Sequence, residues 1–465
     1  MIVLDITIVN VAIPSIERAL AFTPTSLTWV VDAYTLVFGG LLLLGGRSGD
    51  IFGRRRMFVI GVLLFAGASF AGGLAQSSAM LIAARAVQGI GGAIASPTAL
   101  ALIASNFVEQ RERTEALSIY AAASAAGASL GLVAGALLTQ YLSWRWVFFV
   151  NTPIAILLAA LAPVLLRESR KQEVPADLFG ALMSVVAVGG LVYGLIHSAD
   201  SGWTSPVSLG AFTVGFGGLA LFVTREHRVV TPLLELSLFA NRRRSSGYAV
   251  MFLVIAAQFS LWFFLTQYFQ DVLGYSPLKT GFAFLPMTVV AMVIARSGPR
   301  FVRRVGIFPP MIYGPFAVGV ALYMLSLLGA TSDYWTQVLP VLLIQATGLG
   351  ATFASVFPAS MTKVTHREAG LSSAMVMVAQ QVGGTLGLSV LATVSAAAAV
   401  AKLHTLATAV PQLTTGRMRV LVDLAGWTAG FRVGAFIGLI GVLAAVLGAL
   451  RDRAPDLDVL PATAE

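Results

Sequence analysis

The chain has 465 residues, of which 57% are hydrophobic and only 11% are charged. A soluble domain carries about 25% charged residues, so this composition excludes an ordinary soluble protein and indicates one built for lipid. The net charge of +9 does not indicate a nucleic-acid-binding protein, because no basic helix or aromatic-basic stripe is present. The absence of cysteine excludes disulfides, thiolate catalysis and cysteine-based metal sites.

Apolar runs long enough for membrane helices recur along the whole chain. A membrane helix needs about 20 mostly apolar residues. We predict fourteen of them, near residues 1–20, 27–45, 57–75, 79–103, 117–140, 146–166, 178–197, 207–224, 248–270, 281–297, 307–329, 336–360, 370–400 and 428–450. The expected fold class is an all-α integral membrane protein, with an outer loop over 401–427 and a cytoplasmic tail over 451–465.

The first predicted helix is short on its cytoplasmic side. From Met1 to Pro14 a helix rises about 21 Å, which is less than the roughly 30 Å of the hydrocarbon core. The run also meets a charged residue, Asp5, after only four residues. We therefore expect this helix to be truncated, with the natural start of the protein upstream of Met1.

Basic residues give the orientation. With a cytoplasmic N-terminus, 22 of the 30 Lys and Arg residues fall on the inner side, 6 fall on the outer side, and Arg85 and Arg432 lie within helices. Cytoplasmic loops carry an excess of Lys and Arg. We expect a multi-pass protein of the cell (inner or plasma) membrane with both termini in the cytoplasm.

Three segments of the first half return in the second half in the same order. Their offsets are 249, 257 and 256 residues for "RSGDIFGRR" (47–55) and "RSGPRFVRR" (296–304), "QGIG" (88–91) and "QATG" (345–348), and "GASLGL" (127–132) and "GGTLGL" (383–388). The repeat predicts two six-helix bundles, 1–166 and 248–450, joined by a linker, 167–247, that contains two extra helices. Parallel repeats of this kind are the layout of major facilitator transporters, whose substrate site lies between the halves.

Five further stretches carry a family resemblance. They are "LDITIVNVAIP" (4–14), "GGRSGDIFGRRR" (45–56), "RAVQGIGGA" (85–93), "WRWVFFVNTP" (144–153) and "YFQDVLGYSPLKTG" (268–281). Together, in this order, they resemble the fourteen-helix drug:proton antiporter branch of the major facilitator superfamily. The resemblance implies a multidrug efflux transporter that works by alternating access, with the proton gradient as energy source, no cofactor and no bound metal.

The loop between the second and third helices is expected to act as a gate. Gly49 and Gly53 permit a tight turn, and Asp50 can accept hydrogen bonds from a helix N-terminus or from Arg54. Such a latch, with Arg55, would hold in one conformation and break in the other. The simpler interpretation is a basic cytoplasmic loop without a gating role.

Three charged residues inside the predicted helices are candidates for proton or cation coupling: Asp5, Asp32 and Arg85. A buried arginine must face a partner or a wet cavity. The resemblance associates the arginine with steadying a carboxylate or water during proton transfer, and it places an aspartate at the position of Asp5. The alternatives are a structural ion pair for Arg85 and an interfacial acid for Asp32.

The fifth predicted helix carries Gly127, Gly131 and Gly135, which match the glycine motif of the antiporters. Leu132 and Ala136 stand where that motif has proline and glycine. Small residues allow two helices to pack closely. The alternative interpretation is that the three glycines serve this packing alone and have no role in transport.

Polar and aromatic residues within other helices are candidates for the substrate cavity. They are Asn10, Gln88, Trp262, Gln267, Gln345 and Gln381. Aromatic rings suit flat cations through cation–π contact, whereas the alternative for the aromatic residues of 259–269 is contact with lipid. Asn10 could instead join two helices by a hydrogen bond.

The preferred function is therefore proton-coupled export of amphipathic or cationic small molecules, by a chain that works as a monomer. The alternative is a transporter of the same fold for another solute, by export of a metabolite, siderophore or lipid, or by uptake. A membrane enzyme is the third class, but no metal, nucleotide or Ser/His/Asp motif supports it.

Overall fold

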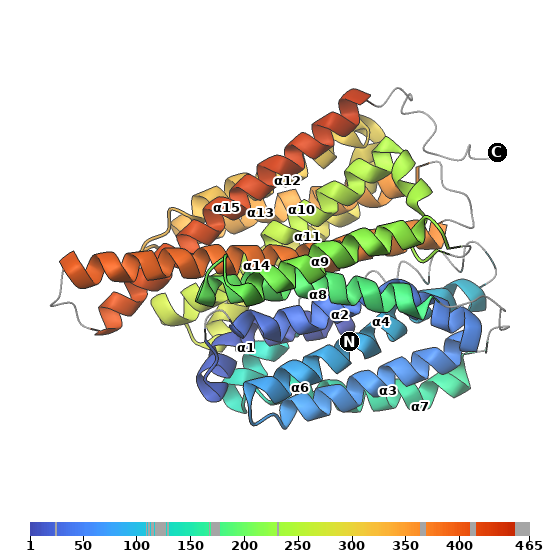
Figure 1. The fold of residues 1–465 in the computed structure, drawn as a ribbon, viewed down its shortest axis with the longest axis horizontal. Helices are drawn as coiled ribbons and strands as arrows, with labels where there is room; N and C mark the ends of the chain where they lie inside the picture. The colour runs from blue at the N-terminus through green and yellow to red at the C-terminus, as the bar shows by residue number, and fades with distance from the viewer. Residues whose placement is uncertain are drawn as a thin grey trace.

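Figure 1 shows the fold of the protein in a computed structural model. The structure describes residues 1–23, 26–107, 109, 112, 116, 127, 130–166, 168, 177–229, 232–362, 369–409 and 415–451. Part of the fifth predicted helix and the tail beyond Arg451 lie outside the described residues. Apart from the tail, so do seven of the basic residues counted on the inner side: Arg111, Arg113, Arg167, Arg170, Lys171, Lys363 and Arg367.

The described chain is built from helices and contains no strand in these ranges. The first group of helices is α1 (Ile2–Leu20), α2 (Trp29–Phe52), α3 (Arg54–Gly73), α4 (Ser78–Asn106), a helix over Leu130–Tyr141, α6 (Trp146–Phe149) and α7 (Asn151–Leu165). We call this group the N bundle. The next two are α8 (Leu178–Ser201) and α9 (Pro206–Glu226).

The last group forms what we call the C bundle. Its helices are α10 (Arg242–Gln267), α11 (Pro277–Val305), α12 (Phe308–Leu325), α13 (Leu339–Ser360), α14 (Ala369–Ala409) and α15 (Thr415–Arg451). The expected loop over 401–427 is therefore largely helical in its described part, because α14 continues to Ala409 and α15 begins at Thr415. At 1.5 Å per residue, the 41 residues of α14 extend well beyond a hydrocarbon core of about 30 Å.

Twelve helices of the described residues are long and apolar enough to cross a membrane, so the chain is a multi-pass membrane protein. Helix α1 is not among the twelve; it carries Asp5, Glu17 and Arg18 within its 19 residues. The fifth predicted span is described as a helix only over Leu130–Tyr141. The all-α membrane class is confirmed, and the count of fourteen stays a prediction.

Side-chain caps fix where several helices begin. Ser77 accepts a hydrogen bond from the Met80 amide at the start of α4, and Asn241 accepts from two amides at the start of α10. Serine and asparagine are preferred here because their oxygens satisfy amides that have no partner within the helix. Between α2 and α3 the chain reverses at Gly53, whose φ of 101° is available at little cost only to glycine.

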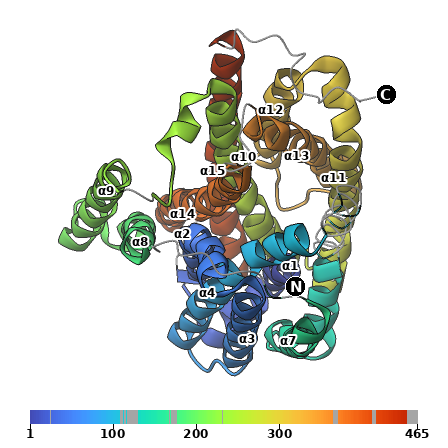
Figure 2. The same cartoon turned by 90° about the vertical axis from the view of Figure 1, so that its right-hand side faces the viewer.

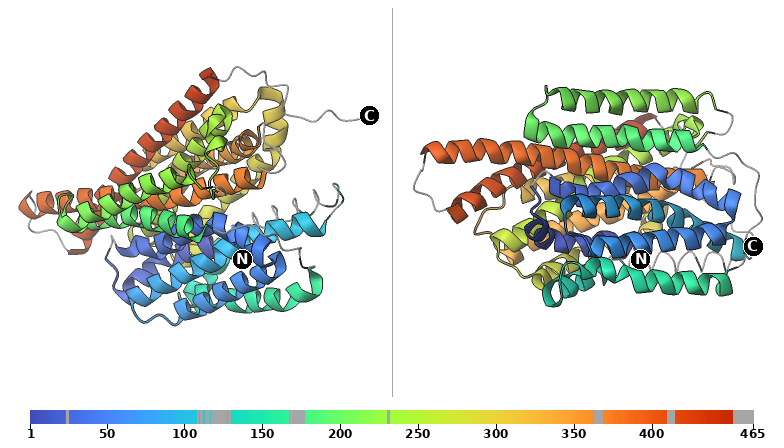
Figure 3. Two further views of the ribbon diagram at one scale, coloured as in Figure 1. Left: turned by 45° about the vertical axis from the view of Figure 1, so that its right-hand side comes forward. Right: turned by 60° about the horizontal axis from the view of Figure 1, so that its bottom comes forward.

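The two bundles contact each other at one end of the molecule. Gln270 Nε2 donates to the Val11 carbonyl at 3.0 Å, the Leu278 amide donates to Gln140 Oε1 at 3.1 Å, and Arg419 Nη2 lies 3.7 Å from Glu17 Oε1. We call this the closed end. The helices of the two bundles diverge toward the opposite end (Figure 3). This end holds the start of α3 and the ends of α11 and α15, and we call it the arginine end.

Helices α8 and α9 lie together at one side of the molecule (Figure 2). Helix α8 packs against α2 of the N bundle and α14 of the C bundle. Ser184 Oγ donates to the Gly40 carbonyl at 3.1 Å, and Thr393 Oγ1 donates to the Leu195 carbonyl at 2.9 Å. At the arginine end, hydrogen bonds from Arg225 hold the pKa of Asp177 below its ordinary value and close the hairpin.

Candidate functional site

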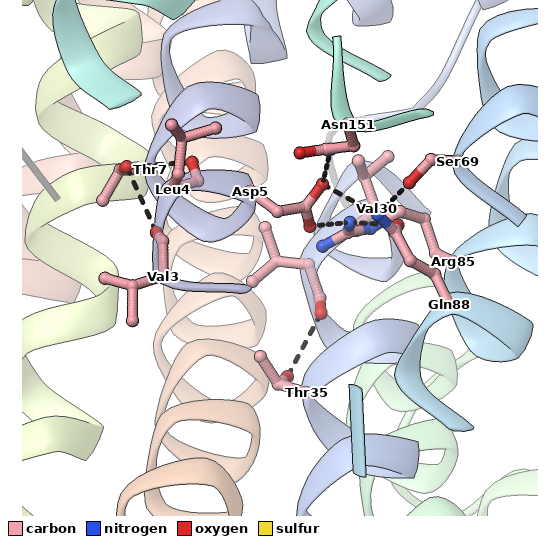
Figure 4. A network of polar contacts seen from close by, with 11 residues as sticks. Val3, Leu4, Asp5, Thr7, Val30, Thr35, Ser69, Arg85, Gln88 and Asn151 are labelled. Carbon is pink, nitrogen blue, oxygen red and sulfur yellow. Dashed lines mark hydrogen bonds and ion pairs between the residues drawn. The ribbon is translucent and has the colours of Figure 1, made fainter. Parts of the chain in front are cut away.

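A buried polar cluster lies inside the N bundle around Asp5 (Figure 4). Arg85 Nη1 donates to Asp5 Oδ2 at 2.7 Å, and Gln88 Nε2 and Asn151 Nδ2 donate to Asp5 Oδ1 at 2.8 and 2.7 Å. Asp5 is fully buried, and Arg85 is 2% exposed. Both carboxylate oxygens are therefore occupied by donors from α4 and α7, within a single bundle.

The guanidinium of Arg85 is held on several sides. Its Nε donates to the Val30 carbonyl at 2.8 Å, and its Nη1 also donates to Gln88 Oε1 at 2.6 Å. The ring of Tyr34 lies 4.4 Å from the guanidinium carbon, which is within cation–π range. An arginine can be buried in a membrane helix only when its charge and donors are satisfied in this way.

The positions of these side chains follow from helix geometry. Arg85 and Gln88 are three residues apart on α4 and therefore share one face toward α1. Gln88 Nε2 donates to Ser69 Oγ on α3 at 2.7 Å, while Asn151 is the first residue of α7. Ser69, Tyr34 and Asn151 are not among the predicted site residues, although Asn151 lies within the motif 144–153.

A second buried carboxylate, Asp32, lies where α2 meets α14. Ser389 Oγ of α14 donates to Asp32 Oδ2 at 3.2 Å, and Thr28 adds a side-chain hydrogen bond. Asp32 Oδ1 has no hydrogen-bond partner, and no described Lys or Arg forms an ion pair with this residue. One turn along the same seam, the hydroxyls of Thr35 and Thr385 are 2.6 Å apart. Asp32 therefore lies between the two bundles, whereas Asp5 lies inside one.

The C bundle holds a neutral polar pair. Gln345 Nε2 of α13 donates to Gln258 Oε1 of α10, and both residues are buried. Gln258 Nε2 and Gln345 Oε1 have no partner within the described chain. Gln381 of α14 is also buried and lies against Gly39 of α2, so it belongs to the seam between the bundles.

The remaining candidates of the substrate cavity are spread over the C bundle and α1. Gln267 lines a cavity of about 410 Å³ at the closed end, together with Phe263, Trp427 and the charged residues Glu17, Asp271, Arg419 and Asp423. Trp262 packs on Phe284, with 4.7 Å between the ring centroids. Asn10 is 7% exposed on α1. The six predicted residues are thus not gathered in one pocket, and their role stays a prediction.

The loop at the start of α3 forms a compact charged group at the arginine end. Arg54 donates to Asp50 Oδ1 from Nη2 at 2.8 Å and from Nε at 3.0 Å, and it reaches the Ala101 carbonyl at 3.3 Å. Glu168 accepts hydrogen bonds from the amides of Arg55 and Arg56 at 3.0 and 3.1 Å. Glu168 is not among the predicted gate residues; its carboxylate lies at the N-terminus of α3, where a negative charge is favoured.

The glycines of the fifth helix lie against α1. A Cβ atom at Gly131 would meet the Leu4 carbonyl at 2.8 Å, and one at Gly135 would meet the Ile8 carbonyl at 2.6 Å. At Gly127 the nearest atom would be 3.8 Å away. In the C bundle, Gly383 and Gly387 lie equally close to the backbone of α10. Both halves therefore use glycine for the same helix contact.

The fold and this arrangement are those of a transporter family, and the sequence comparison identifies it. Residues 1–388 match the model of the Major Facilitator Superfamily, so the chain belongs to this family. A bacterial homologue of the human lysosomal transporter Spinster, solved in an inward-facing and occupied conformation, shares the fold with a TM-score of 0.65. The match has 15% identity and covers 97% of this chain and 94% of that one.

Several relatives are resistance or export proteins, as the resemblance to the drug:proton antiporter branch implies. The puromycin resistance protein of Streptomyces alboniger is 39% identical over 98% of this chain and 90% of its own length. The cephamycin export protein of Amycolatopsis lactamdurans is 36% identical over 85% of this chain and 82% of its own. The multidrug resistance protein Stp of Mycobacterium tuberculosis is 35% identical over 85% and 74%.

Proposed function

We propose that this protein exports amphipathic or cationic small molecules in exchange for protons. The names of its relatives support drug or antibiotic export. The observation that carries the proton part is the buried group of Asp5, Arg85, Gln88 and Asn151, because a buried charged residue in a membrane helix is expensive and is retained for function.

The Asp5–Arg85 pair couples protonation to structure. A proton on Asp5 would leave Arg85 buried without a counter-ion, and an uncompensated buried charge costs about 3–5 kcal/mol. The guanidinium would then move away from Asp5 toward another partner or toward water. Arg85 of α4 and Asn151 of α7 both donate to Asp5 of α1, so a movement of the guanidinium would change how these three helices pack in the N bundle.

Asp32 is the second group of the proposed cycle. It is buried at the seam between α2 and α14, with one oxygen unpartnered, so an ionised carboxylate there has no counter-charge. Either a proton or a substrate cation would neutralise it. If α2 and α14 separated, Asp32 would be exposed to water, and a bound proton could then be exchanged for a substrate cation.

Alternating access supplies the transport step. We assign the arginine end to the cytoplasm, because basic residues concentrate on that side, and the closed end to the outside. The described contacts between the bundles at the closed end then correspond to an inward-open state. In the outward-open state these contacts break, and the Asp50–Arg54 group, as the proposed gate, joins the bundles at the arginine end.

The same proposal includes fourteen membrane helices in a cell membrane, both termini in the cytoplasm and a single chain as the working unit. The two bundles of one chain provide both walls of a central pathway, which supports a monomer. Gln267, Trp262, Gln345 and Gln381 are the proposed polar and aromatic contacts of the substrate on the C bundle side.

The test is transport by the intact protein. In an efflux-deficient bacterium, expression should lower the accumulation of a cationic dye, and a protonophore should restore it. The variant Asp5→Asn should lose this effect at equal expression, whereas Asp333→Asn, at an exposed helix cap, should keep it. If dye accumulation changed neither on expression of the protein nor on addition of the protonophore, the proposal would be contradicted. Retained pH-driven exchange by Asp5→Asn in proteoliposomes would remove Asp5 from proton coupling.

A further inference from the structure

A groove of about 690 Å³ opens at the arginine end of the C bundle, and none of the residues that line it belongs to the Asp5 cluster. Its walls come from the end of α11 and the start of α12, and its floor comes from α13. Figure 2 shows these three helices at the side of the molecule opposite α8 and α9. At the floor, Gly298 of α11 lies so close to Ala354 of α13 that a Cβ atom would not fit between them.

The charge of the groove is positive. Arg300 and Arg304 both line it, one turn apart on α11, and both are exposed. Among the residues that the structure describes, no carboxylate forms an ion pair with either guanidinium. The apolar part of α11 ends at Gly298, so the two arginines follow immediately after the membrane span. This is the depth at which phospholipid headgroups lie.

Apart from Ser297 and Thr347, the rest of the groove is lined by apolar and aromatic residues. Phe301 of α11 is 54% exposed and Tyr313 of α12 is 45% exposed, while Ile294 and Ala351 continue the surface toward the membrane interior. The Tyr313 hydroxyl is bonded to Thr347 Oγ1 at 2.7 Å, so the ring presents its apolar face. A hydrocarbon chain lying here would cover aromatic and aliphatic side chains.

We propose that this groove binds an anionic phospholipid, with its phosphate on Arg300 and Arg304 and one acyl chain along Ile294, Phe301 and Tyr313. A soluble anion would use the charges but leave the apolar surface uncovered. A neutral lipid would cover that surface but leave two guanidinium groups without a counter-charge. Only a lipid with a negative headgroup matches both parts, and basic pockets between membrane helices bind such headgroups.

The proposal is tested by lipid binding to the purified full-length protein in detergent. Native mass spectrometry with added phosphatidylglycerol should show a bound lipid on the unmodified protein. The variant Arg300→Gln/Arg304→Gln should bind about 30-fold more weakly, which corresponds to two interfacial arginines. Arg303→Gln is the matched control, because Arg303 is exposed at the same end of α11 but does not line the groove.

Two further arms distinguish the ligand. Phosphatidylcholine at the same concentration should bind weakly, and inorganic phosphate should not displace phosphatidylglycerol. Ser297→Trp fills the groove without changing its charge and should also reduce lipid binding. Equal binding of both lipids, full displacement by phosphate, or an equal loss in Arg303→Gln would each overturn the proposal. Thermal unfolding of every variant without lipid shows that the fold is retained.

Discussion

The same helix contact occurs in both halves of the protein, between α1 and α4 in the N bundle and between α10 and α13 in the C bundle, but the side chains that form it differ. In the N bundle, Gln88 of α4 donates to the carboxylate of Asp5 on α1; in the C bundle, Gln345 of α13 donates to the amide of Gln258 on α10. Gln88 and Gln345 are matching residues of the repeated "QGIG" and "QATG" segments. Three residues before each glutamine stands Arg85 in the first half and Leu342 in the second.

At this helix contact, the buried acid and the buried arginine occur together in one half and are both absent from the other half. The N bundle has the acid and the arginine, whereas the C bundle has an amide and a leucine at the corresponding places. A buried acid without the arginine, or the reverse, would be a buried charge without a partner. In the proposed transport cycle, the proton therefore binds in the N bundle, while the C bundle keeps a polar contact that cannot change its charge.

The largest effect is expected from Arg85→Leu, which gives the N bundle the residue of the C bundle. It leaves Asp5 buried without its cation, so the free energy of unfolding should fall by about 3–5 kcal/mol and transport should be lost. Denaturant unfolding in mixed micelles and dye export measure the two effects. The double variant Asp5→Gln/Arg85→Leu should regain most of the stability but no proton-coupled transport. Export by that double variant at the normal rate would contradict the assignment of the proton to the N bundle.

The next effect concerns the glycines that both halves share. Gly131→Ala and Gly387→Ala should each lower the free energy of unfolding by about 1–3 kcal/mol, because the added methyl group meets backbone of α1 or α10. Gly127→Ala is the control, since its Cβ has room, and it should be neutral or slightly stabilising. Thermal unfolding in detergent compares the three. A loss at Gly127 equal to that at Gly131 would contradict this prediction, because it would show that the close contact with α1 does not determine the effect.

A smaller effect is expected from Gln345→Leu in the C bundle. The change leaves Gln258 buried without its partner, which costs about 1–3 kcal/mol. The pair Gln258→Leu/Gln345→Leu removes both polar groups and should return the free energy of unfolding to within about 1 kcal/mol of the starting value. Proton dependence of export should persist in both variants. Its loss would mean that the neutral pair takes part in coupling, which would remove the distinction between the halves.

The smallest change in stability is expected from Asp32→Asn. The side chain keeps its shape and Asp32 has no ion pair to lose, so the free energy of unfolding should change by less than about 1 kcal/mol. Export in proteoliposomes, however, should lose its dependence on the imposed pH gradient. Asp333→Asn provides the exposed control. An unchanged response to the gradient would leave Asp5 as the only carboxylate in the proposed cycle.

Much of the fold could be predicted from composition, because long apolar runs and the distribution of arginine are properties of the sequence itself. Asp5 and Arg85 could also be singled out, since a charge inside an apolar run is conspicuous. The sequence does not tell how a helix is rotated in its bundle. Asn151, Ser69 and Glu168 are ordinary polar residues near helix ends or in an apolar helix, and only the packing of α3, α7 and α4 brings them to their partners.

The candidate substrate residues also show that a sequence does not tell which partner a buried polar side chain contacts. Gln88 and Gln345 are both predicted at the substrate cavity; in this structure the amide of Gln88 completes the Asp5 cluster and Gln345 pairs with Gln258. A polar residue in an apolar helix has two uses, a ligand contact or a contact with another helix, and both follow the same sequence pattern. Three-dimensional contacts are needed to tell them apart.

Helix α8 has a mechanical consequence for the moving parts. One rigid helix accepts Thr393 of the C bundle at Leu195 and donates through Ser184 to Gly40 of the N bundle. When the bundles rotate about their seam, a helix attached to both cannot follow both. In the proposed alternating-access cycle, at least one of these hydrogen bonds would be released or exchanged at each step, and the hairpin of α8 and α9 would limit how far the bundles rotate.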